Sequence, residues 1–231
     1  MSQSLQAKFD ALHAERVRSW APDKLAGNIA QRQALVERFA PEAVVKVGDV
    51  VAPFVLQLST GGAAALASLT HDGPVALIFF RFAGCPACNI ALPHYDEHLR
   101  PALDKAGIRI VAASPHLPEK GLDEIRVRHG LGFDVASDRD NSLARRFGLT
   151  FVPYDNPPKP ENDETWIGAL TGTDSWELPM PAVVVIDRQG VVRFADVSPD
   201  WLRRIEAATI LSEVAQLSEQ SHEFMVRASL P

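Results

Sequence analysis

The spacing of apolar residues divides the chain into a helical beginning and a longer, alternating part. Over residues 1–42, apolar positions recur near helical spacing in two groups, first Leu5, Phe9, Leu12 and Trp20 and then Leu25, Ile29, Val36 and Phe39. Pro22 separates the two groups and Pro41 ends the second, because proline is tolerated only at the start of a helix. We therefore expect a helical hairpin over 1–42, which serves either as a dimer arm or lid or as a cap covering one face of the core.

From residue 47 onward, short apolar runs alternate with helical stretches. We expect strands at 52–58, 63–69, 75–80, 108–113, 134–136, 182–186 and 191–195, with a hairpin turn at 59–62. Helices are expected at 86–106, 118–129, 141–147 and 205–217, and Pro93 and Pro101 should kink or split the first of them. Strands separated by helices predict a mostly parallel sheet whose closing hairpin is antiparallel.

Two further segments have weaker patterns. Residues 151–181 are rich in proline but contain Trp166 and Trp176, so part of this insertion should pack against the domain. Residues 218–231 form a tail with no pattern beyond a continuation of the last helix. The sequence therefore predicts one α/β domain over 43–217, preceded by the helical hairpin and followed by the tail.

Composition and charge narrow the class of protein. A chain of 231 residues, 46% of them hydrophobic, is long enough to bury a full core. The net charge is −6 and no basic run is present, which argues against nucleic acid and anionic membranes as partners. The first residues lack the apolar core of a signal peptide, and no apolar stretch approaches the roughly 20 residues of a membrane span. We expect a cytoplasmic protein.

The two cysteines are the strongest chemical signal. Cys85 and Cys88 are the only cysteines of the chain, and they follow an apolar strand at the start of a helical stretch. Free backbone N–H groups and the helix dipole favour a thiolate at such a position. A second thiol one turn away can close a disulfide behind the first, so the pair is typical of a redox centre.

Two other interpretations of the pair are weaker. A structural zinc ion needs four ligands, but the chain has no second C-x-x-C, and the nearby His94 and His98 lie more than a turn further along the helix. Two inert, buried cysteines remain an alternative. We expect neither a metal nor an organic cofactor.

An ordered set of short segments carries a family resemblance. In sequence order the segments are VGD at 47–49, APF at 52–54, CPACN at 85–89, SP at 114–115, SD at 137–138, WELPMPA at 176–182, VID at 185–187 and GVVR at 190–193. Over about residues 45–217 the chain resembles the peroxiredoxin-like branch of the alkyl hydroperoxide reductase/thiol-specific antioxidant family, within the thioredoxin superfamily. The resemblance implies a thioredoxin-like α/β fold, in which a central mixed sheet is flanked by helices, with an N-terminal helical extension. It also implies a cis-proline at Pro181, where the alternative is an ordinary trans turn.

Around the cysteines, the chain departs from both the peroxiredoxin and the thioredoxin sequence patterns. Aligned on Cys88, the peroxiredoxin threonine is replaced by Cys85 and the peroxiredoxin proline by Arg81. Gly84 stands where thioredoxins have tryptophan, and Phe79 stands where they have a buried acid. In the thioredoxin register Cys85 is the nucleophile, and in the peroxiredoxin register Cys88 is. We expect Cys85 to attack first, because the first position of the motif should be the more exposed.

The resemblance also implies the cation, the substrate site and the reaction. Peroxiredoxins place an arginine near the thiolate from the segment before the final helix, which here contains Arg203 and Arg204. Arg81 is a second candidate cation, and we expect the substrate to contact Arg81, Gly84, Met180 and Pro181. We predict a thiol-dependent peroxidase that reduces hydrogen peroxide or small organic hydroperoxides and is recycled by a thioredoxin- or glutathione-type reductant. The alternatives are a thiol–disulfide oxidoreductase acting on protein disulfides and a redox-sensing binding module, and the helical arm would allow a homodimer.

Overall fold

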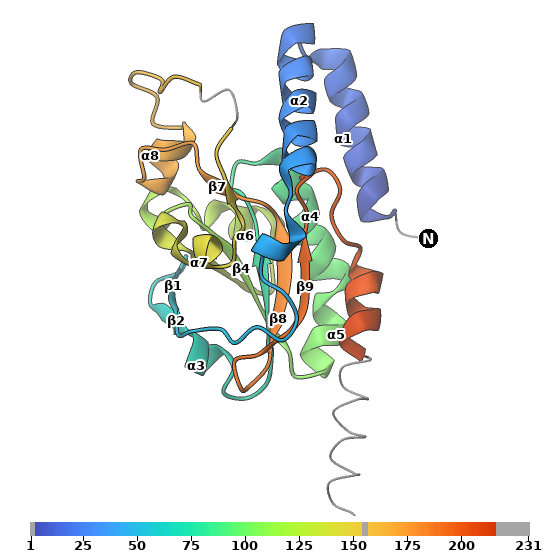
Figure 1. Cartoon of the computed structure of the whole chain (residues 1–231), viewed down its shortest axis with the longest axis vertical. Coiled ribbons are helices and arrows are strands. Elements are labelled where there is room, and N and C mark those ends of the chain that lie inside the picture. The colour runs from blue at the N-terminus through green and yellow to red at the C-terminus, as the bar shows by residue number, and fades with distance from the viewer. Residues whose placement is uncertain (1–2, 154–156, 216–231) are drawn as a thin grey trace, which may run out of the picture.

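The computed structural model describes residues 3–153 and 157–215. Its centre is a seven-stranded mixed sheet with the strand order β2-β1-β5-β4-β3-β8-β9 (Figure 1). These strands are β1 (Val55–Leu58), β2 (Ala63–Ala65), β3 (Val75–Phe79), β4 (Arg109–Ser114), β5 (Asp134–Ser137), β8 (Ala182–Ile186) and β9 (Val192–Val197). The mixed sheet and its flanking helices confirm the expected thioredoxin-like architecture. The expectation of a mostly parallel sheet is wrong, because among the described strands of this sheet only the β3–β4 and β4–β5 pairings are parallel and the other four are antiparallel.

The middle of the sheet is apolar because it is covered on both faces. All five residues of β3 are buried, and β3 pairs parallel with β4 and antiparallel with β8, with Leu77 opposite Val111 and Val184. One face packs against α4 (Pro86–His98), α5 (Arg100–Lys105), α6 (Glu124–His129) and the helix at 207–215. The other face packs against α3 (Leu66–Leu69) and α7 (Ser142–Arg146). Successive side chains of a strand point to opposite faces of the sheet, so the apolar strands contribute to one hydrophobic core on each face.

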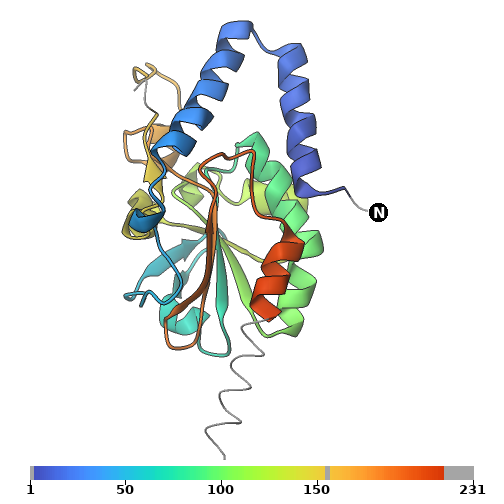
Figure 2. The same ribbon diagram turned by 45° about the vertical axis from the view of Figure 1, so that its right-hand side comes forward.

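The N-terminal hairpin consists of α1 (Leu5–Ser19) and α2 (Pro22–Arg38), which stand splayed above the sheet (Figure 2). Helix α1 buries Leu5 and Phe9 completely in the same core as α4. Its N-terminus is fixed by the carboxylate of Glu206, which accepts hydrogen bonds from the N–H groups of Leu5 and Gln6 at 3.0 and 2.9 Å. Helix α2 buries no residue fully and is tied down by Arg32, whose guanidinium contacts the Asp200 carboxylate at 3.1 Å. The two helices expected over 1–42 are present, and α1 is a packed cap.

Several element boundaries differ from the expected ones. The run at 63–69 is a short strand followed by the single-turn helix α3, because LASL alone does not separate a strand from a helix. The helix expected at 86–106 is split near Pro101, whereas Pro93 lies inside α4. At 118–129 a 3₁₀ turn, η2 (Pro118–Lys120), precedes α6, and Gly121 between them has φ +94°. The last helix runs over 207–215, and the expected tail at 218–231 lies outside the described residues.

The insertion at 151–181 is partly ordered by its tryptophans. Its elements are β6 (Thr150–Phe151), α8 (Ile167–Thr171) and β7 (Leu178–Pro179), and β6 and β7 form a separate antiparallel pair. The Trp166 and Trp176 rings meet edge to face at 5.1 Å, and Trp176 Nε1 donates to the Pro157 carbonyl at 2.8 Å. These tryptophan contacts lie within the insertion. The expectation that part of the insertion packs against the domain is confirmed at α8, where the Leu117 N–H donates to the Leu170 carbonyl at 3.0 Å.

The expected cis bond before Pro181 is wrong. None of the peptide bonds between described residues is cis. The chain around Pro181 is extended, with the Met180 N–H donating to the Leu149 carbonyl at 2.7 Å and the Pro181 carbonyl accepting from Ser198 at 2.8 Å. A trans bond, which X–Pro pairs prefer by about 0.5–1 kcal/mol, suffices for this path. Within the part of the chain that the structure describes, no helix is long and apolar enough to cross a bilayer.

Candidate active site at the start of helix α4

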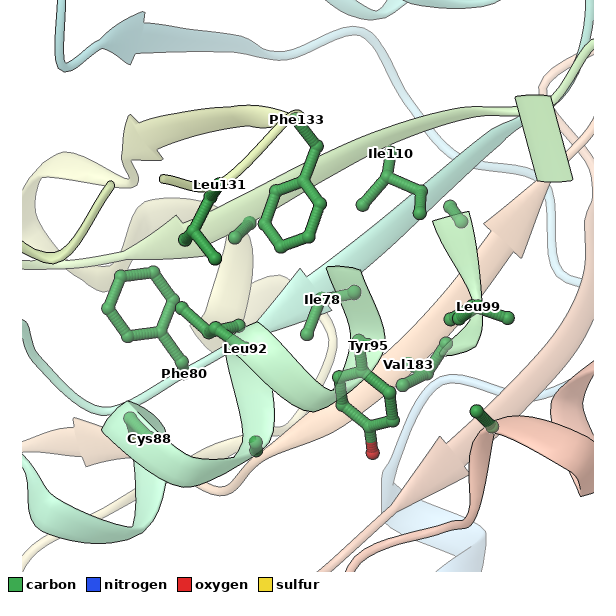
Figure 3. Packing of buried hydrophobic residues seen from close by; sticks show 14 of the residues in the cluster. Ile78, Phe80, Cys88, Leu92, Tyr95, Leu99, Ile110, Leu131, Phe133 and Val183 are labelled. Carbon is green, nitrogen blue, oxygen red and sulfur yellow. The ribbon is translucent and has the colours of Figure 1, made fainter. Parts of the chain in front are cut away.

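The cysteine pair occupies the junction that the strand–loop–helix pattern predicts. Cys85 is the N-cap residue of α4, Pro86 opens the helix, and Cys88 lies on the first turn, at the end of the apolar cluster in Figure 3. The first helical hydrogen bond runs from the Asn89 N–H to the Cys85 carbonyl at 3.0 Å. Both cysteines are reduced in the structure and both side chains are buried, with exposed fractions of 2% and 0%. The expected greater exposure of Cys85 is therefore not found.

The loop before the cysteines is held by a buried histidine. His116 Nδ1 accepts a hydrogen bond from the Ala83 N–H at 3.2 Å, so its proton is on Nε2, which donates to the Lys120 carbonyl at 2.9 Å. Burial lowers the pKa of His116, which keeps the ring in this neutral form. On the other side, Asn89 Nδ2 donates to the carbonyls of Ala83 and Cys85 at 2.7 and 2.9 Å. The loop geometry is thus fixed from both sides.

Arg204 is the cation at the sulfur. Its Nη2 donates to Cys88 Sγ at 3.3 Å, and its Nε donates to the Trp201 carbonyl at 3.1 Å. The guanidinium is buried beneath the Phe9 ring of α1, 5.5 Å from the ring centroid. Burial opposes the charge of the guanidinium, but the negative charge of the Cys88 thiolate and the hydrogen bond to it raise the pKa of Arg204. A buried, permanently charged donor therefore points at Cys88.

The two thiols have opposite acidities. Burial raises the pKa of Cys88, but the hydrogen bond from Cys85, the charge and hydrogen bond of Arg204 and the backbone of Arg81 together lower that pKa well below its ordinary value. The pKa of Cys85 is raised well above its ordinary value, because its thiol donates the hydrogen bond to Cys88 and is itself buried. The arrangement is a Cys88 thiolate that accepts hydrogen bonds from a neutral Cys85 thiol and from Arg204.

Arg81 lies beside the pair in an aromatic setting. Its guanidinium stacks on Trp201 at 4.2 Å and lies 5.9 Å from the Phe151 ring, and Nε has no hydrogen-bond partner among the described residues. Its positive charge lowers the pKa of Cys85 but does not offset the hydrogen bond and the burial. Of the two arginines, only Arg204 donates a side-chain hydrogen bond to a cysteine sulfur that the structure records, and that sulfur is Cys88 Sγ.

The other residues expected at the site differ in how close they lie to the cysteines. The Arg203 side chain is 77% exposed and lies 4.0 Å from the Asp200 carboxylate, so only Arg204 of the two arginines reaches the sulfur. Gly84 is exposed next to the buried Cys85. Pro181 lines a small cavity of about 10 Å³ together with Arg204, and Met180 is buried just before it.

Sequence reasoning missed the side chains that enclose the arginines. Trp201, Phe151 and Phe9 come from three segments that are far apart in the chain, and His116 comes from a fourth. Trp201 could have been found from its position three residues before Arg204. Phe9 has no such signal, because it occupies an ordinary apolar position of an amphipathic helix.

The structure offers no candidate metal centre among the residues it describes. The His94 and His98 rings meet edge to face at 4.5 Å further along α4. Among all described residues, no group of three His, Cys, Asp or Glu side chains is arranged to hold an ion. The chemistry available at the site is that of the dithiol and the arginines.

Comparisons with known proteins agree with this architecture. A curated relative, the thiol-disulfide oxidoreductase ResA of Halalkalibacterium halodurans, is 27% identical over 117 residues, which are 50% of this chain and 64% of that protein. The chain thus spans less than two thirds of that relative. A solved structure of peroxidoxin BcpB from Mycobacterium tuberculosis has a TM-score of 0.57 at 22% identity, covering 74% of this chain and 97% of that one. A peroxiredoxin-like protein from Aquifex aeolicus has a TM-score of 0.56 at 18% identity, covering 75% and 88%.

These structural likenesses show a shared fold. The family itself is shown by a family model described as "AhpC/TSA family", which matches residues 47–195. Helix α1 and Arg204 lie outside the matched residues, so their roles rest on the geometry above. Because the match covers more than half of the chain and includes both cysteines, the protein belongs to the AhpC/TSA family.

Proposed function

We propose that the protein is a thiol peroxidase in which Cys88 attacks the peroxide and Cys85 resolves the product. The observation that carries the proposal is the contact between Arg204 Nη2 and Cys88 Sγ at 3.3 Å in a buried site. A thiolate beside a fixed cation supplies both the nucleophile and a donor for the charge that develops on the leaving oxygen. Membership of the AhpC/TSA family supports the same assignment.

The reaction follows from the two acidities. The Cys88 thiolate attacks one peroxide oxygen, the O–O bond breaks, and the leaving oxygen takes a proton to depart as water or an alcohol. Arg204 stabilises the negative charge on that oxygen as it forms. Cys88 is left as a sulfenic acid, and the Cys85 thiol condenses with it to give a disulfide and water. The cycle needs no metal or organic cofactor.

This assignment reverses the order of attack expected from sequence. The expectation favoured Cys85 because the first cysteine should be more exposed, but neither sulfur has appreciable exposure. The Arg204 contact then favours Cys88, because Nη2 donates to Cys88 Sγ at 3.3 Å. In this arrangement the Cys85 thiol stands in place of the threonine hydroxyl that orients the peroxide in the peroxiredoxin pattern.

The substrate and partners are proposed at the level of chemical class. Burial of both sulfurs favours hydrogen peroxide or a small organic hydroperoxide over a protein substrate. The disulfide is recycled by a thioredoxin- or glutathione-type reductant. A cytoplasmic location suits a dithiol that must return to the reduced state. A homodimer involving the N-terminal arm remains a prediction from sequence.

The second candidate function is reduction of protein disulfides. The C-x-x-C motif at a helix start favours it, and so does the similarity to the relative named thiol-disulfide oxidoreductase ResA. The geometry is less favourable, because a protein disulfide must reach an exposed sulfur, whereas α1 packs in the core above this site.

Two reactions of the reduced protein separate the candidates. Stopped-flow mixing with hydrogen peroxide should give a rapid single turnover, after which mass spectrometry finds one Cys85–Cys88 disulfide per chain. In an insulin-reduction assay with the same preparation, turnover should stay close to that of free dithiol. Rapid insulin reduction together with a peroxide rate no greater than that of free cysteine would establish the oxidoreductase instead.

A further inference from the structure

The sulfur of Cys88 and the guanidinium beside it are both enclosed by the protein. Cys88 has no exposed surface, and Arg204 is only 7% exposed. In the proposed reaction a peroxide must contact Cys88 Sγ and the Arg204 guanidinium together, but these two groups are already in contact at 3.3 Å. A substrate therefore needs a route to Arg204 and a side chain that moves to admit it.

The side chain that covers Arg204 is Phe9 of α1. The centroid of its ring lies 5.5 Å from the central carbon of the Arg204 guanidinium, and the ring is fully buried. Helix α1 is anchored one turn earlier, where the Glu206 carboxylate accepts the N–H groups of Leu5 and Gln6. A phenylalanine ring makes no such hydrogen bond, so a change of its rotamer can uncover the guanidinium while the helix stays anchored.

A cleft of about 450 Å³ reaches Phe9 from outside. It is lined by residues of α1, α2 and the segment at 200–203, which directly precedes Arg204. Figure 2 shows α1 and α2 diverging from their shared turn toward the domain. The volume lies within the range of about 300–1,000 Å³ that is usual for small-molecule sites. Because Phe9 both lines this cleft and lies against Arg204, it stands between the cleft and the reacting atoms.

The lining of the cleft suits a neutral, partly apolar molecule. Ile29, Val36 and Leu202 supply apolar surface at its walls. The charged residues that line it are three acids and two arginines, namely Asp10, Glu37, Asp200, Arg32 and Arg203. The guanidinium of Arg32 is already engaged by the Asp200 carboxylate at 3.1 Å. A carboxylated molecule would thus meet more negative than positive charge in the cleft, whereas a neutral one is not repelled.

Two cleft-lining residues also offer polar atoms for a hydroperoxide group. His13 Nδ1 and Arg32 Nε are buried and have no hydrogen-bond partner among the described residues. Buried polar atoms are nearly always hydrogen-bonded, so atoms of this kind favour a bound polar group. The O–O–H group both donates and accepts hydrogen bonds and can therefore bond to either atom on its way to Arg204.

We propose that neutral organic hydroperoxides bind in the cleft between α1 and α2, and that Phe9 is the specificity-determining residue that admits their O–O–H group to Arg204 and Cys88. The inference rests on the proposed function, because it names the substrate class of that site. The apolar part of the substrate lies against Ile29 and Leu202. Hydrogen peroxide uses the same entry but has no apolar part to gain from these walls.

The first test narrows the cleft from α2. Ile29→Trp adds bulk at the cleft wall, and Gly27→Trp, the matched control, adds it on the other side of the helix, where a new Cβ meets no heavy atom within 4 Å. Helix α2 buries no residue fully, so neither variant disturbs a core. Stopped-flow mixing measures the rate with cumene hydroperoxide relative to that with hydrogen peroxide. Ile29→Trp should lower this hydroperoxide ratio by on the order of tenfold, and Gly27→Trp should leave it unchanged.

The second test removes the cover. Phe9→Ala and its matched control Leu5→Ala both shorten a fully buried side chain of α1 in the same core, but only Phe9 lines the cleft. Both variants loosen the packing of α1 to a similar degree. Phe9→Ala should raise the hydroperoxide ratio by on the order of tenfold, because the bulkier substrate gains most from a wider entry. Leu5→Ala should leave the ratio unchanged.

Labelling of the reduced protein separates failure of the entry route from failure of the proposed function. Maleimides alkylate Cys88 without any peroxidase chemistry, and mass spectrometry locates the label. The rate with N-benzylmaleimide relative to N-methylmaleimide should rise in Phe9→Ala, fall in Ile29→Trp and stay constant in the two controls. If every hydroperoxide reacts slowly while this labelling ratio shifts as expected, the peroxidase assignment fails and the entry route stands.

Three results would overturn the proposal. The first is that Ile29→Trp and Phe9→Ala leave both ratios unchanged, which would mean that substrates reach Cys88 by another path. The second is that Gly27→Trp and Leu5→Ala shift the ratios as much as their partners do, which would mean that the helices act only through stability. The third is that a carboxylated cumene hydroperoxide reacts as fast as the neutral compound. If Phe9→Ala does not fold, the Ile29→Trp and Gly27→Trp pair decides by the same criteria.

Discussion

At the scale of single residues, the site depends on which of the two sulfurs Arg204 contacts. The two cysteines are equally buried, and both lie within the influence of Arg204. Arg204 Nη2 nevertheless donates to Cys88 Sγ alone, at 3.3 Å, and the pKa of Cys88 is lowered while that of Cys85 is raised. This difference between the two thiols makes Cys88 the nucleophile and Cys85 the resolving thiol.

The first prediction concerns the pH dependence of the peroxide reaction. Because only the thiolate attacks, the second-order rate constant should fall about tenfold per pH unit below the pKa of Cys88 and level off above it. The lowered pKa places the midpoint below the ordinary cysteine value of about 8.5. Stopped-flow rates across the pH range give the midpoint, and Cys85→Ala should move it upward by removing a donor. A midpoint at or above the ordinary value would contradict the assigned thiolate.

The second prediction separates the roles of the cysteines. Cys88→Ser should abolish the reaction with peroxide, since a hydroxyl is a poor nucleophile at neutral pH. Cys85→Ser should react once and stop at a sulfenic acid on Cys88, which dimedone traps and mass spectrometry locates. The opposite pattern, with the sulfenic acid on Cys85 of Cys88→Ser, would restore the order expected from sequence.

At the scale of elements, the site is assembled from pieces with very different local signals. Strand β3 and the start of α4 could be predicted, because an apolar run followed by Pro86 is a pattern that a few neighbouring residues suffice to identify. Arg204 could be predicted only as one of two neighbours, because sequence does not show which side chain of a short irregular segment turns inward. The contact of Phe9 with Arg204 joins residues from opposite ends of the chain, and no local pattern encodes it.

The third prediction concerns the docking of α1. The Glu206 carboxylate accepts two N–H groups at the N-terminus of α1, where the helix dipole also favours negative charge. Glu206→Gln removes the charge and should lower the free energy of unfolding by about 1–2 kcal/mol, measured by urea denaturation. Glu213→Gln, exposed on the helix at 207–215, is the control and should change little. Equal effects of the two variants would show that Glu206 does not anchor the helix.

The fourth prediction concerns the His116 clamp on the loop before the cysteines. Its pKa is lowered in the folded protein, so the unfolded chain binds the extra proton first as the pH falls. The stability due to neutral His116 should be complete above the ordinary value of 6.5 and be lost as the pH falls below it. The free energy of unfolding should thus depend less steeply on pH below 6.5 in His116→Gln than in the unchanged protein. Parallel profiles would show that the clamp does not titrate.

At the scale of the whole molecule, an acidic chain concentrates cations at its redox centre. The net charge is −6, yet Arg204 donates to Cys88 Sγ at 3.3 Å and Arg81, in the loop just before the cysteines, stacks on Trp201. The family match covers the sheet and the cysteines, whereas Phe9 and Arg204 come from the parts before and after it. The fold could therefore be predicted from the family pattern, but the electrostatic surroundings of the dithiol could not, because they depend on how the two ends of the chain pack over α4.

The most direct test of the account compares the two neighbouring arginines in the peroxide reaction. Arg204→Leu removes the buried donor at Cys88, and Arg203→Leu removes an exposed charge one residue away. Stopped-flow rates with hydrogen peroxide should fall by on the order of a hundredfold in Arg204→Leu, because the leaving oxygen loses its stabilising cation. They should stay near the unchanged rate in Arg203→Leu. An Arg204→Leu variant that is folded and reacts at the unchanged rate would contradict the account.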